Sequence, residues 1–315
     1  MGLLRGKLDA EPTTAYLMTY KDGRCLANCG FCPQARQSRS RIDMLSRVSW
    51  PTFNVFALLK KIEDAFLKGN IIRVCIQALN YPEVFNHLEA LVKSISRLGV
   101  PISVSCQPLN VDSIIGLKDA GAERIGIPLD AATEEIFDII KGRAAGGPYE
   151  MRRQWELLEK ALQIFGRGFV STHFIVGLGE TEKEMVYVIQ RCTDMGITSA
   201  LFAFTPVPGT FLEKNNPPLI QHYRRVQLAR YLIVNGFSRA ELMNFNEYDQ
   251  ITSFGVNFET LRYAVLSGEP FRTSGCPGCN RPYYNEKPSG PVYNYPRPLS
   301  QEEIIKIAEE LNLTL

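Results

Sequence analysis

The chain has 315 residues, of which 35 are basic and 33 acidic, so its net charge is near +2, and it contains eight cysteines. This balance excludes a broad basic surface for nucleic acid, and no apolar run approaches the length of a membrane-spanning helix. The first residues carry no apolar core of signal-peptide length, so we expect a cytoplasmic protein whose cysteines bind metal or fill the core rather than form disulfides.

Short apolar runs alternate with longer helical patterns along the chain. The runs predict eight mostly buried strands, at residues 14–20, 71–77, 101–107, 123–129, 168–177, 200–207, 239–245 and 270–275. The segments between them have apolar residues at helical spacing, and nearly all end on Gly, which favours the left-handed cap of a helix. These patterns predict helices at residues 52–69, 82–99, 110–121, 132–142, 149–166, 181–196, 221–236 and 258–268.

Regular alternation of strand and helix predicts a parallel sheet covered by helices, and eight repeats predict an α/β fold of the (β/α)8 TIM-barrel type, closed or partly open. A further helix is expected at residues 300–312, with Ser300 and Glu303 forming a capping box. Residues 280–298 are rich in Pro and Tyr, which indicates a tail folded over the active-site mouth. We therefore expect a barrel at residues 1–275 and a C-terminal extension at residues 276–315.

Three cysteines lie close together after the first predicted strand. Cys25, Cys29 and Cys32 have the spacing C-x3-C-x2-C, and no fourth ligand lies near them in the sequence. A structural zinc site needs four protein ligands, whereas a four-iron cluster held by three thiolates leaves one iron open for another molecule. Zinc and chance spacing are the alternatives, but the missing fourth ligand favours the iron–sulfur cluster.

This spacing, with the aromatic Phe31 before the last cysteine, resembles the radical S-adenosylmethionine (SAM) superfamily, and the resemblance covers essentially the whole chain. It implies that the open iron chelates the amino and carboxylate groups of SAM. An electron from the cluster would then cleave SAM to a 5′-deoxyadenosyl radical, which abstracts hydrogen from an unactivated carbon. The protein would hold cofactor and substrate in register and exclude water and oxygen.

A second element of the resemblance follows the fifth predicted strand. The segment FIVGLGE resembles the family's glycine-rich element beside the adenine of SAM. Ile175, Gly177 and Glu180 match that element and are implied to contact the cofactor. His173 replaces the first glycine, and we assign it no catalytic role.

The segments IGIPLD and IIKGR resemble the biotin synthase branch of the superfamily. The resemblance implies that Asp130 binds the ribose hydroxyls and that Arg143, with Arg152 or Arg153, faces the methionine carboxylate. Arginine suits that role because its guanidinium can bind a carboxylate with two parallel hydrogen bonds. The alternative for these residues is ordinary surface charge. Gln77 stands where many family members have a Gly-Gly-Glu element.

Biotin synthase has a second, two-iron cluster in its barrel. Its ligand positions fall on Cys75, Ser103 and Ser171 here, so only one thiolate matches, and that cluster is disfavoured. Cys75, Cys106, Cys276 and Cys279 instead make up a four-thiolate set for a second four-iron cluster. The alternatives are that Cys75 and Cys106 are buried strand residues and that the C-terminal pair is half of a zinc site. Cys192 is expected to fill the core.

Ser274, just before the C-terminal cysteine pair, resembles a serine through which lipoyl synthases ligate a sacrificial second cluster. The total pattern resembles a subunit of the two-component, archaeal-type lipoyl synthase. That resemblance implies a sulfurtransferase acting on an octanoyl chain of a lipoyl carrier domain, with a second homologous subunit and a ferredoxin or flavodoxin as partners. The basic run at residues 36–41 is a candidate docking patch for the acidic carrier.

Two rival functions remain open from the sequence. The chain is either another biotin synthase-like radical enzyme, including biotin synthase itself or an enzyme of amino-acid or small-metabolite chemistry, or a non-catalytic iron–sulfur or zinc protein. The non-catalytic class is distinguished by whether the reduced protein cleaves SAM. We expect no nucleic acid and no membrane among the partners.

Overall fold

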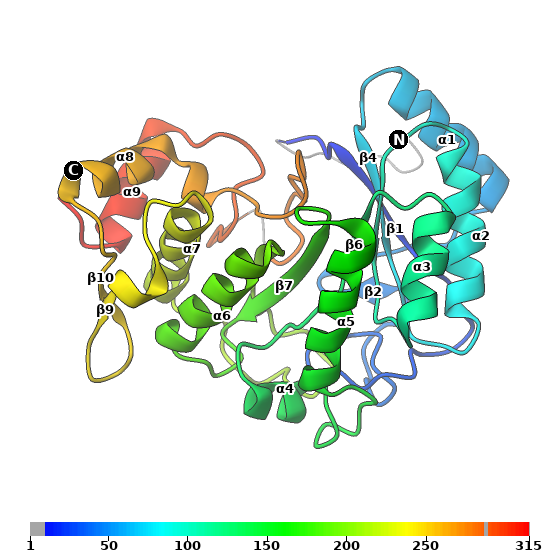
Figure 1. Cartoon of the computed structure of the whole chain (residues 1–315), viewed down its shortest axis with the longest axis horizontal. Helices are drawn as coiled ribbons and strands as arrows, with labels where there is room; N and C mark the ends of the chain where they lie inside the picture. The colour runs from blue at the N-terminus through cyan, green and yellow to red at the C-terminus, as the bar shows by residue number, and fades with distance from the viewer. Residues whose placement is uncertain (1–9, 287–288, 315) are drawn as a thin grey trace.

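The computed structural model describes residues 10–286 and 289–314. Within these residues, a main sheet of six parallel strands has the order β1-β4-β5-β6-β7-β8, and it curls into part of a barrel (Figure 1). The partly open form of the predicted barrel is therefore confirmed. The strands are β1 (Thr14–Met18), β4 (Arg73–Gln77), β5 (Ile102–Ser105), β6 (Arg124–Gly126), β7 (Val170–Val176) and β8 (Thr198–Ala203).

The predicted helices are all present. They are α1 (Val55–Leu67), α2 (Val84–Ser96), α3 (Val111–Asp119), α4 (Glu134–Ile140), α5 (Met151–Phe165), α6 (Glu182–Met195), α7 (Ile220–Val234), α8 (Phe258–Ser267) and α9 (Gln301–Glu310). The expected capping box of the last helix forms between Ser300 and Glu303. In Figure 1, α1–α3 lie at one end of the sheet and α7–α9 at the other, with α5 and α6 between them. In the described part of the chain, no helix is long and apolar enough to cross a membrane.

The strand register aligns residues that later form a site. Cys75 of β4 pairs with Tyr16 of β1 on one side and with Ser103 of β5 on the other. Paired residues of neighbouring strands point to the same face of a sheet, so these three side chains form one row across it. The row faces the concave side of the sheet, where a cavity is lined by Cys75 and Ser103.

The segments expected as the seventh and eighth strands lie outside the main sheet. Residues 239–245 form the short 3-10 helix η1 (Ala240–Leu242) and strand β9 (Asn244–Phe245), which pairs with β10 (Ile251–Ser253). Residues 270–275 include the 3-10 helix η2 (Glu269–Phe271). Arg239 and Glu241 are charged and Pro270 lacks an N–H, features that oppose an inner strand of a parallel sheet. The helices α7, α8 and α9 occupy this end instead (Figure 1).

The C-terminal extension is fastened to α7 by a buried arginine. Arg224 is 1% exposed and donates to the carbonyl oxygens of Val292 (2.6 Å) and Tyr293 (2.7 Å). It also pairs with Glu310 of α9 at 3.0 Å. These bonds hold the extension against the open end of the sheet. The small hairpin of β2 (Met44–Leu45) and β3 (Val48–Ser49) follows the first cysteine loop.

Candidate active site

The first cavity lies at the carboxyl ends of the strands. Its volume is about 170 Å³, and Cys25, Cys29 and Cys32 all line it. Ile175 and Phe202, from β7 and β8, form part of its apolar wall. Chemistry in barrels of this type gathers at the carboxyl ends of the strands, where the structure brings the three predicted cluster ligands together. The predicted tail also reaches this mouth, since residues 281, 284 and 285 line the cavity.

The cysteine loop is shaped for sulfur ligands. The backbone N–H of Asn80 donates to the sulfur of Cys25 at 3.1 Å, the kind of contact that supports a cluster-bound thiolate. Gly30 at the centre of the loop donates to the Ile140 carbonyl oxygen at 2.7 Å, which ties the loop to α4. Burial raises the pKa of the Cys29 thiol to about 12, so this cysteine gives up its proton only to a strong partner such as a metal.

A buried charged trio lies beside the cysteines. Lys141, 1% exposed, donates to Asp130 Oδ2 at 2.5 Å, and His173 Nε2 lies 2.9 Å from Asp130 Oδ1. Burial alone would raise the pKa of Asp130, but Lys141 and His173 hold it well below its usual range. Both carboxylate oxygens thus have a partner within the protein, and each can accept one further hydrogen bond. Binding of ribose hydroxyls by Asp130 stays a prediction.

Of the three residues predicted to lie beside the adenine, Ile175 lines the first cavity, whereas Gly177 and Glu180 are in the turn that follows, and contact with the cofactor stays a prediction. The side chain of Glu180 folds back to accept the N–H of Gly177 at 2.7 Å. Gly177 has a φ of +102°, and a Cβ there would lie 2.9 Å from Pro218 Cδ. The turn therefore requires glycine at this position.

The three predicted arginines do not line either cavity. Arg143, on the surface, pairs with Glu150. Arg152, 86% exposed, and Arg153 both pair with Glu156 on α5, at 3.5 Å and 3.1 Å. None of the three is brought to the cysteine loop, so a role in binding the methionine carboxylate has no geometric support here. The residue of the IIKGR segment that does line the first cavity is Lys141.

A second cavity adjoins the first on the concave face of the sheet. It is lined by Cys75 together with Cys276 and Cys279, so the C-terminal pair meets the β4 cysteine predicted to join it. The hydroxyl of Tyr16 lies 3.2 Å from the Cys279 sulfur, and Ser103 Oγ lies 3.5 Å from the Cys276 sulfur. Burial raises the pKa of the Cys75 thiol to about 12.

Cys106 differs from the prediction. It lines the first cavity rather than the second, because it follows the end of β5 and side chains alternate along a strand, which leaves Ser103 and Ser105 at the second cavity. Ser274, the other predicted ligand, does line the second cavity, and its hydroxyl oxygen accepts the N–H of Leu201 at 2.8 Å. The structure thus gathers three of the four predicted thiols, with hydroxyl groups beside them.

Several residues line both cavities and form the wall between them, namely Gln77, Ser105, His173, Phe202 and Arg281. The guanidinium of Arg281, which is partly buried, lies over the Phe202 ring, 4.6 Å from its centroid. Burial would lower the pKa of Arg281, but the adjoining Cys279, Tyr16 and Cys75 raise it above its ordinary value. The wall therefore carries a positive charge that complements sulfur ligands in the second cavity.

Neither cysteine set has the geometry of a single bound ion. Among the described residues, no group of three or more His, Cys, Asp or Glu side chains converges closely enough for one metal ion. In a four-iron cluster each thiolate binds a different iron, so its sulfurs lie farther apart than the ligands of one zinc. The first cavity also presents two buried acceptors without a partner in the described chain, Gln107 Oε1 and Asn285 Oδ1. These features fit a cluster with a polar organic ligand.

Several site residues escaped the sequence analysis. Lys141 lies four residues after the buried Phe137, a helical spacing that could have revealed its inward direction. Arg281 follows the cysteine pair by two residues, but nothing local shows that it lies between two cavities. The role of His173 as a partner of Asp130 depends on β6 and β7 being neighbours.

The sequence comparisons agree with this geometry. The profile of the radical SAM superfamily matches residues 23–192. The chain is 27% identical to a biotin synthase of Prochlorococcus marinus (strain MIT 9515) over 228 residues, which cover 70% of this chain and 64% of the relative. It is 25% identical to a biotin synthase of Chlamydia pneumoniae over 221 residues, 67% of this chain and 62% of the relative. The chain thus spans less than two thirds of these two curated relatives.

A solved structure shows the same fold. The FeFe-hydrogenase maturase HydG from Carboxydothermus hydrogenoformans superposes with a TM-score of 0.54 at 16% identity, over 96% of this chain and 67% of that one. At this identity the likeness concerns the fold alone. The profile match and the curated relatives lead to one conclusion: the chain belongs to the radical SAM superfamily, in its biotin synthase-like branch.

Proposed function

We propose that this radical SAM enzyme is a sulfurtransferase of the lipoyl synthase type, one subunit of a two-component enzyme that inserts sulfur into a protein-bound octanoyl chain. The observation that carries the proposal is the wall shared by two cysteine-lined cavities. A sulfur insertion needs a carbon activated at one centre and a sulfur source within reach of it. Two adjoining sites meet that requirement.

The residues present fit the groups that such an enzyme needs. Cys25, Cys29 and Cys32 would hold the first cluster, with SAM beside it, and Cys75, Cys276 and Cys279 would hold the second, with Ser274 as a further ligand. When bound, these groups would supply one-electron cleavage of SAM at the first site and sulfide at the second. The chain itself binds these groups, orients them and shields them from water.

The cavity wall suits an apolar chain held between the two centres. Phe202, Phe204, Ile175 and Tyr284 give the first cavity an apolar side, and Tyr284 and Phe202 lie with their ring centroids 5.8 Å apart. An octanoyl chain is held by such surfaces without specific hydrogen bonds. Closure by the C-terminal extension keeps water from the reacting carbon.

Arg281 and His173 have defined tasks in this arrangement. Arg281 places a fixed positive charge beside Cys75 and Cys279, which favours an anionic cluster there. His173 is oriented by Asp130 and lines both cavities, so its ring gives a polar surface between the two centres. Lys141 balances the Asp130 charge.

The exposed basic residues near the first cysteine loop support docking of an acidic carrier domain. Arg36, Arg39 and Arg41 have exposed side chains, and Arg41 is offset by an ion pair with Asp43 at 2.6 Å. They follow Cys32 directly in the sequence, so a carrier held there has its acyl arm near the cavity mouth. The partner subunit and a ferredoxin or flavodoxin as electron donor remain parts of this proposal.

A second candidate is biotin synthase activity, favoured by the curated relatives. It requires a free small molecule as substrate in place of an acyl-carrier arm. The position of Ser103 and Ser171 at the second cavity, where the two-iron cluster of biotin synthase has cysteines, weighs against it.

The test compares two cysteine variants after anaerobic reconstitution. Cys276→Ala/Cys279→Ala should still cleave SAM to 5′-deoxyadenosine but form no thiolated octanoyl product. The matched control, Cys192→Ala on α6, removes a buried thiol far from both cavities and should retain both activities. Thiolation by the double variant would reject the proposal, and thiolation of dethiobiotin instead of octanoyl carrier would favour biotin synthase activity.

A further inference from the structure

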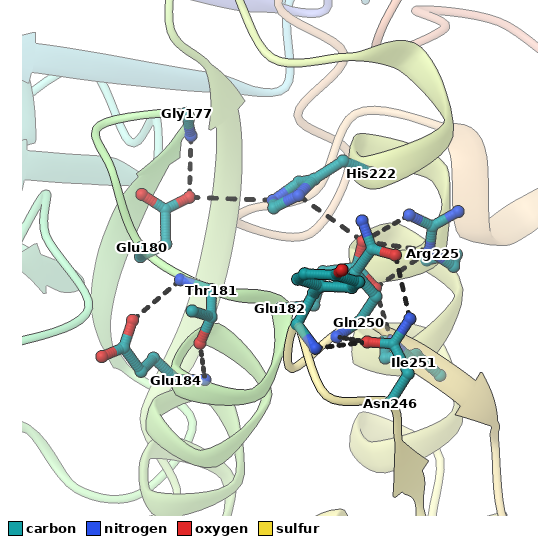
Figure 2. Close-up of polar contacts among 11 residues, drawn as sticks. Gly177, Glu180, Thr181, Glu182, Glu184, His222, Arg225, Asn246, Gln250 and Ile251 are labelled. Carbon is teal, nitrogen blue, oxygen red and sulfur yellow. Dashed lines mark hydrogen bonds and ion pairs between the residues drawn. The ribbon is translucent and has the colours of Figure 1, made fainter.

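The turn between β7 and α6 is fixed by a buried carboxylate. Glu180 accepts two backbone N–H groups, from Gly177 at 2.7 Å (Figure 2) and from Leu178 at 3.0 Å. Its side chain is 1% exposed. No cation neutralises it directly, so this carboxylate depends on the backbone and on one neighbouring ring, among the described residues.

That ring is His222 of α7. Its Nε2 lies 4.0 Å from Glu180 Oε1, and its Nδ1 lies 3.5 Å from Glu182 Oε1 (Figure 2). Nε2 is buried and has no hydrogen-bond partner in the described chain. His222 therefore bridges two carboxylates that belong to the same turn, with one nitrogen toward each.

The two carboxylates differ in charge balance. Glu182, whose side chain is buried, accepts hydrogen bonds from Nε and Nη2 of Arg225 at 2.6–3.0 Å. It also accepts the backbone N–H of Ile251 at 2.7 Å. Arg225 thus neutralises Glu182 and leaves Glu180 uncompensated. The other charged groups around the pair are Glu184, which caps α6, and the exposed Lys183–Asp249 ion pair at 3.2 Å.

A single proton makes the cluster of Glu180, Glu182, His222 and Arg225 electrically neutral. Because Arg225 is paired with Glu182, a single proton on either Glu180 or His222 removes the remaining negative charge. The two sites for that proton, Glu180 Oε1 and His222 Nε2, lie 4.0 Å apart. Burial raises the pKa of Glu180 to about 7 and lowers that of His222 below its ordinary value. Two groups this close titrate as a pair, so the proton belongs to the pair and not to either residue alone.

The turn that Glu180 holds follows Ile175, a lining residue of the first cavity. The side chain of Leu178 packs against a cluster that includes Ile175 and Phe202, both of which line that cavity, and Phe31 of the cysteine loop packs against the same cluster. Displacement of the turn would therefore move Leu178 and, through it, the apolar surface on which a nucleoside base can stack.

We propose that His222 is a positioning residue, which shares one proton with Glu180 and thereby holds the β7–α6 turn and the SAM-binding wall of the first cavity in place. This inference rests on SAM binding by the superfamily and not on sulfur transfer. Below neutral pH the shared proton is present and the turn is closed. As the pH rises and the proton leaves, the carboxylate and the ring lone pair face each other and the turn loosens.

The first experiment measures 5′-deoxyadenosine formation by the reconstituted holoenzyme with variable SAM. His222→Leu should raise the KM for SAM about tenfold, a loss of roughly 1.4 kcal/mol, while kcat changes little, because the cluster ligands are untouched. His222→Gln, which keeps one polar atom toward Glu180, should recover part of the loss. The control is His87→Gln, an exposed histidine on α2.

The pH profile separates positioning from simple packing. In the wild type the KM for SAM should rise as the pH increases through about 7, the midpoint set by burial of Glu180. In His222→Leu it should be high on both sides of neutrality. Because ionisation of SAM itself is common to all variants, only the difference between profiles counts. Superimposable profiles and an unchanged KM would overturn the proposal.

A second readout uses cluster-free protein. The chain has only three histidines, so ¹⁵N-labelled imidazole spectra can be assigned by comparison with His222→Gln. Replacing Glu180 by Gln removes a negative charge beside the ring, so the titration midpoint of His222 should fall while that of His87 stays fixed. An unmoved His222 midpoint would show that the two groups share no proton. Neither result depends on whether the enzyme transfers sulfur.

Discussion

The hydroxyl of Tyr16 lies 3.2 Å from the sulfur of Cys279, although the two residues are 263 positions apart. This contact brings the C-terminal cysteine pair onto the first strand of the sheet, next to Cys75 in the neighbouring strand. The chain thereby places one cysteine set in the loop after β1 and the other against β1 and its neighbour β4. Sulfur ligands from both ends of the sequence share one region of the barrel.

The first prediction concerns radical generation. Substitution of Cys25, Cys29 or Cys32 by Ala should abolish reductive cleavage of SAM, because two thiolates no longer hold the four-iron cluster in place. Cys192→Ala, whose thiol is buried in α6, should cleave SAM like the wild type. A triple variant that still produces 5′-deoxyadenosine would contradict the assignment of the first cavity.

The second prediction concerns the buried ion pair beside that cavity. Lys141→Met leaves the Asp130 carboxylate with His173 as its remaining partner and should lower the free energy of unfolding by about 3–5 kcal/mol. Arg143→Ala breaks only an exposed pair with Glu150 and should cost about 0–1 kcal/mol. Urea unfolding of the cluster-free protein measures both. Equal losses would mean that Asp130 is not held by Lys141.

The same pair predicts an acid dependence. The pKa of Asp130 is held below its ordinary value of 3.8, so its contribution to stability is complete above that pH and is lost as the pH falls further. Lys141→Met should remove most of this loss, since the charge that lowers the pKa is gone. Unfolding free energies measured at successive acidic pH values should therefore converge for the two proteins. Parallel curves would contradict the prediction.

Glu180 predicts that its contribution to folding stability changes with pH in the opposite direction, and nearer to neutral pH. Its pKa is raised from 4.5 to about 7 by burial, so the folded state binds the proton more tightly than the unfolded state. The contribution of Glu180 to stability should be complete below pH 4.5 and decline as the pH rises to about 7, by on the order of 3 kcal/mol at most. Glu180→Gln should have a flatter profile between these values, as measured by thermal unfolding of cluster-free protein.

The attachment of the C-terminal extension predicts a local effect. Arg224→Leu removes the donors to the carbonyl oxygens of Val292 and Tyr293 and leaves Glu310 unpaired, at a cost of about 3 kcal/mol. Limited proteolysis should then cut the chain within residues 276–298 faster than in the wild type. Arg262→Leu, an exposed change on α8, should leave the cleavage rate unaltered. Protection of the extension in Arg224→Leu would show that other contacts hold it.

Local patterns made the helices and the first cysteine site predictable. Gly caps, apolar spacing and the spacing of Cys25, Cys29 and Cys32 all act over a few residues. The sequence predicts Cys106 at the second cysteine site, whereas the structure places it at the first cavity. Local patterns could not show this, because the direction of its side chain depends on where β5 ends. The pairing of His222 with Glu180 joins residues 42 positions apart on different elements, and no local signal marks it. Segments 239–245 and 270–275 resembled strands only in composition.

The most direct test of the central claim follows the inserted sulfur. The protein is reconstituted with ³⁴S-labelled sulfide and unlabelled cysteine, then given octanoylated carrier domain, SAM, reductant and its partner subunit, and the product is examined by mass spectrometry. If the second cluster, held by Cys75, Cys276 and Cys279, is the sulfur source, the octanoyl product carries ³⁴S and turnover stalls near one event per protein. Unlabelled sulfur in the product, or continued turnover without cluster repair, would show that the second cavity does not donate sulfur.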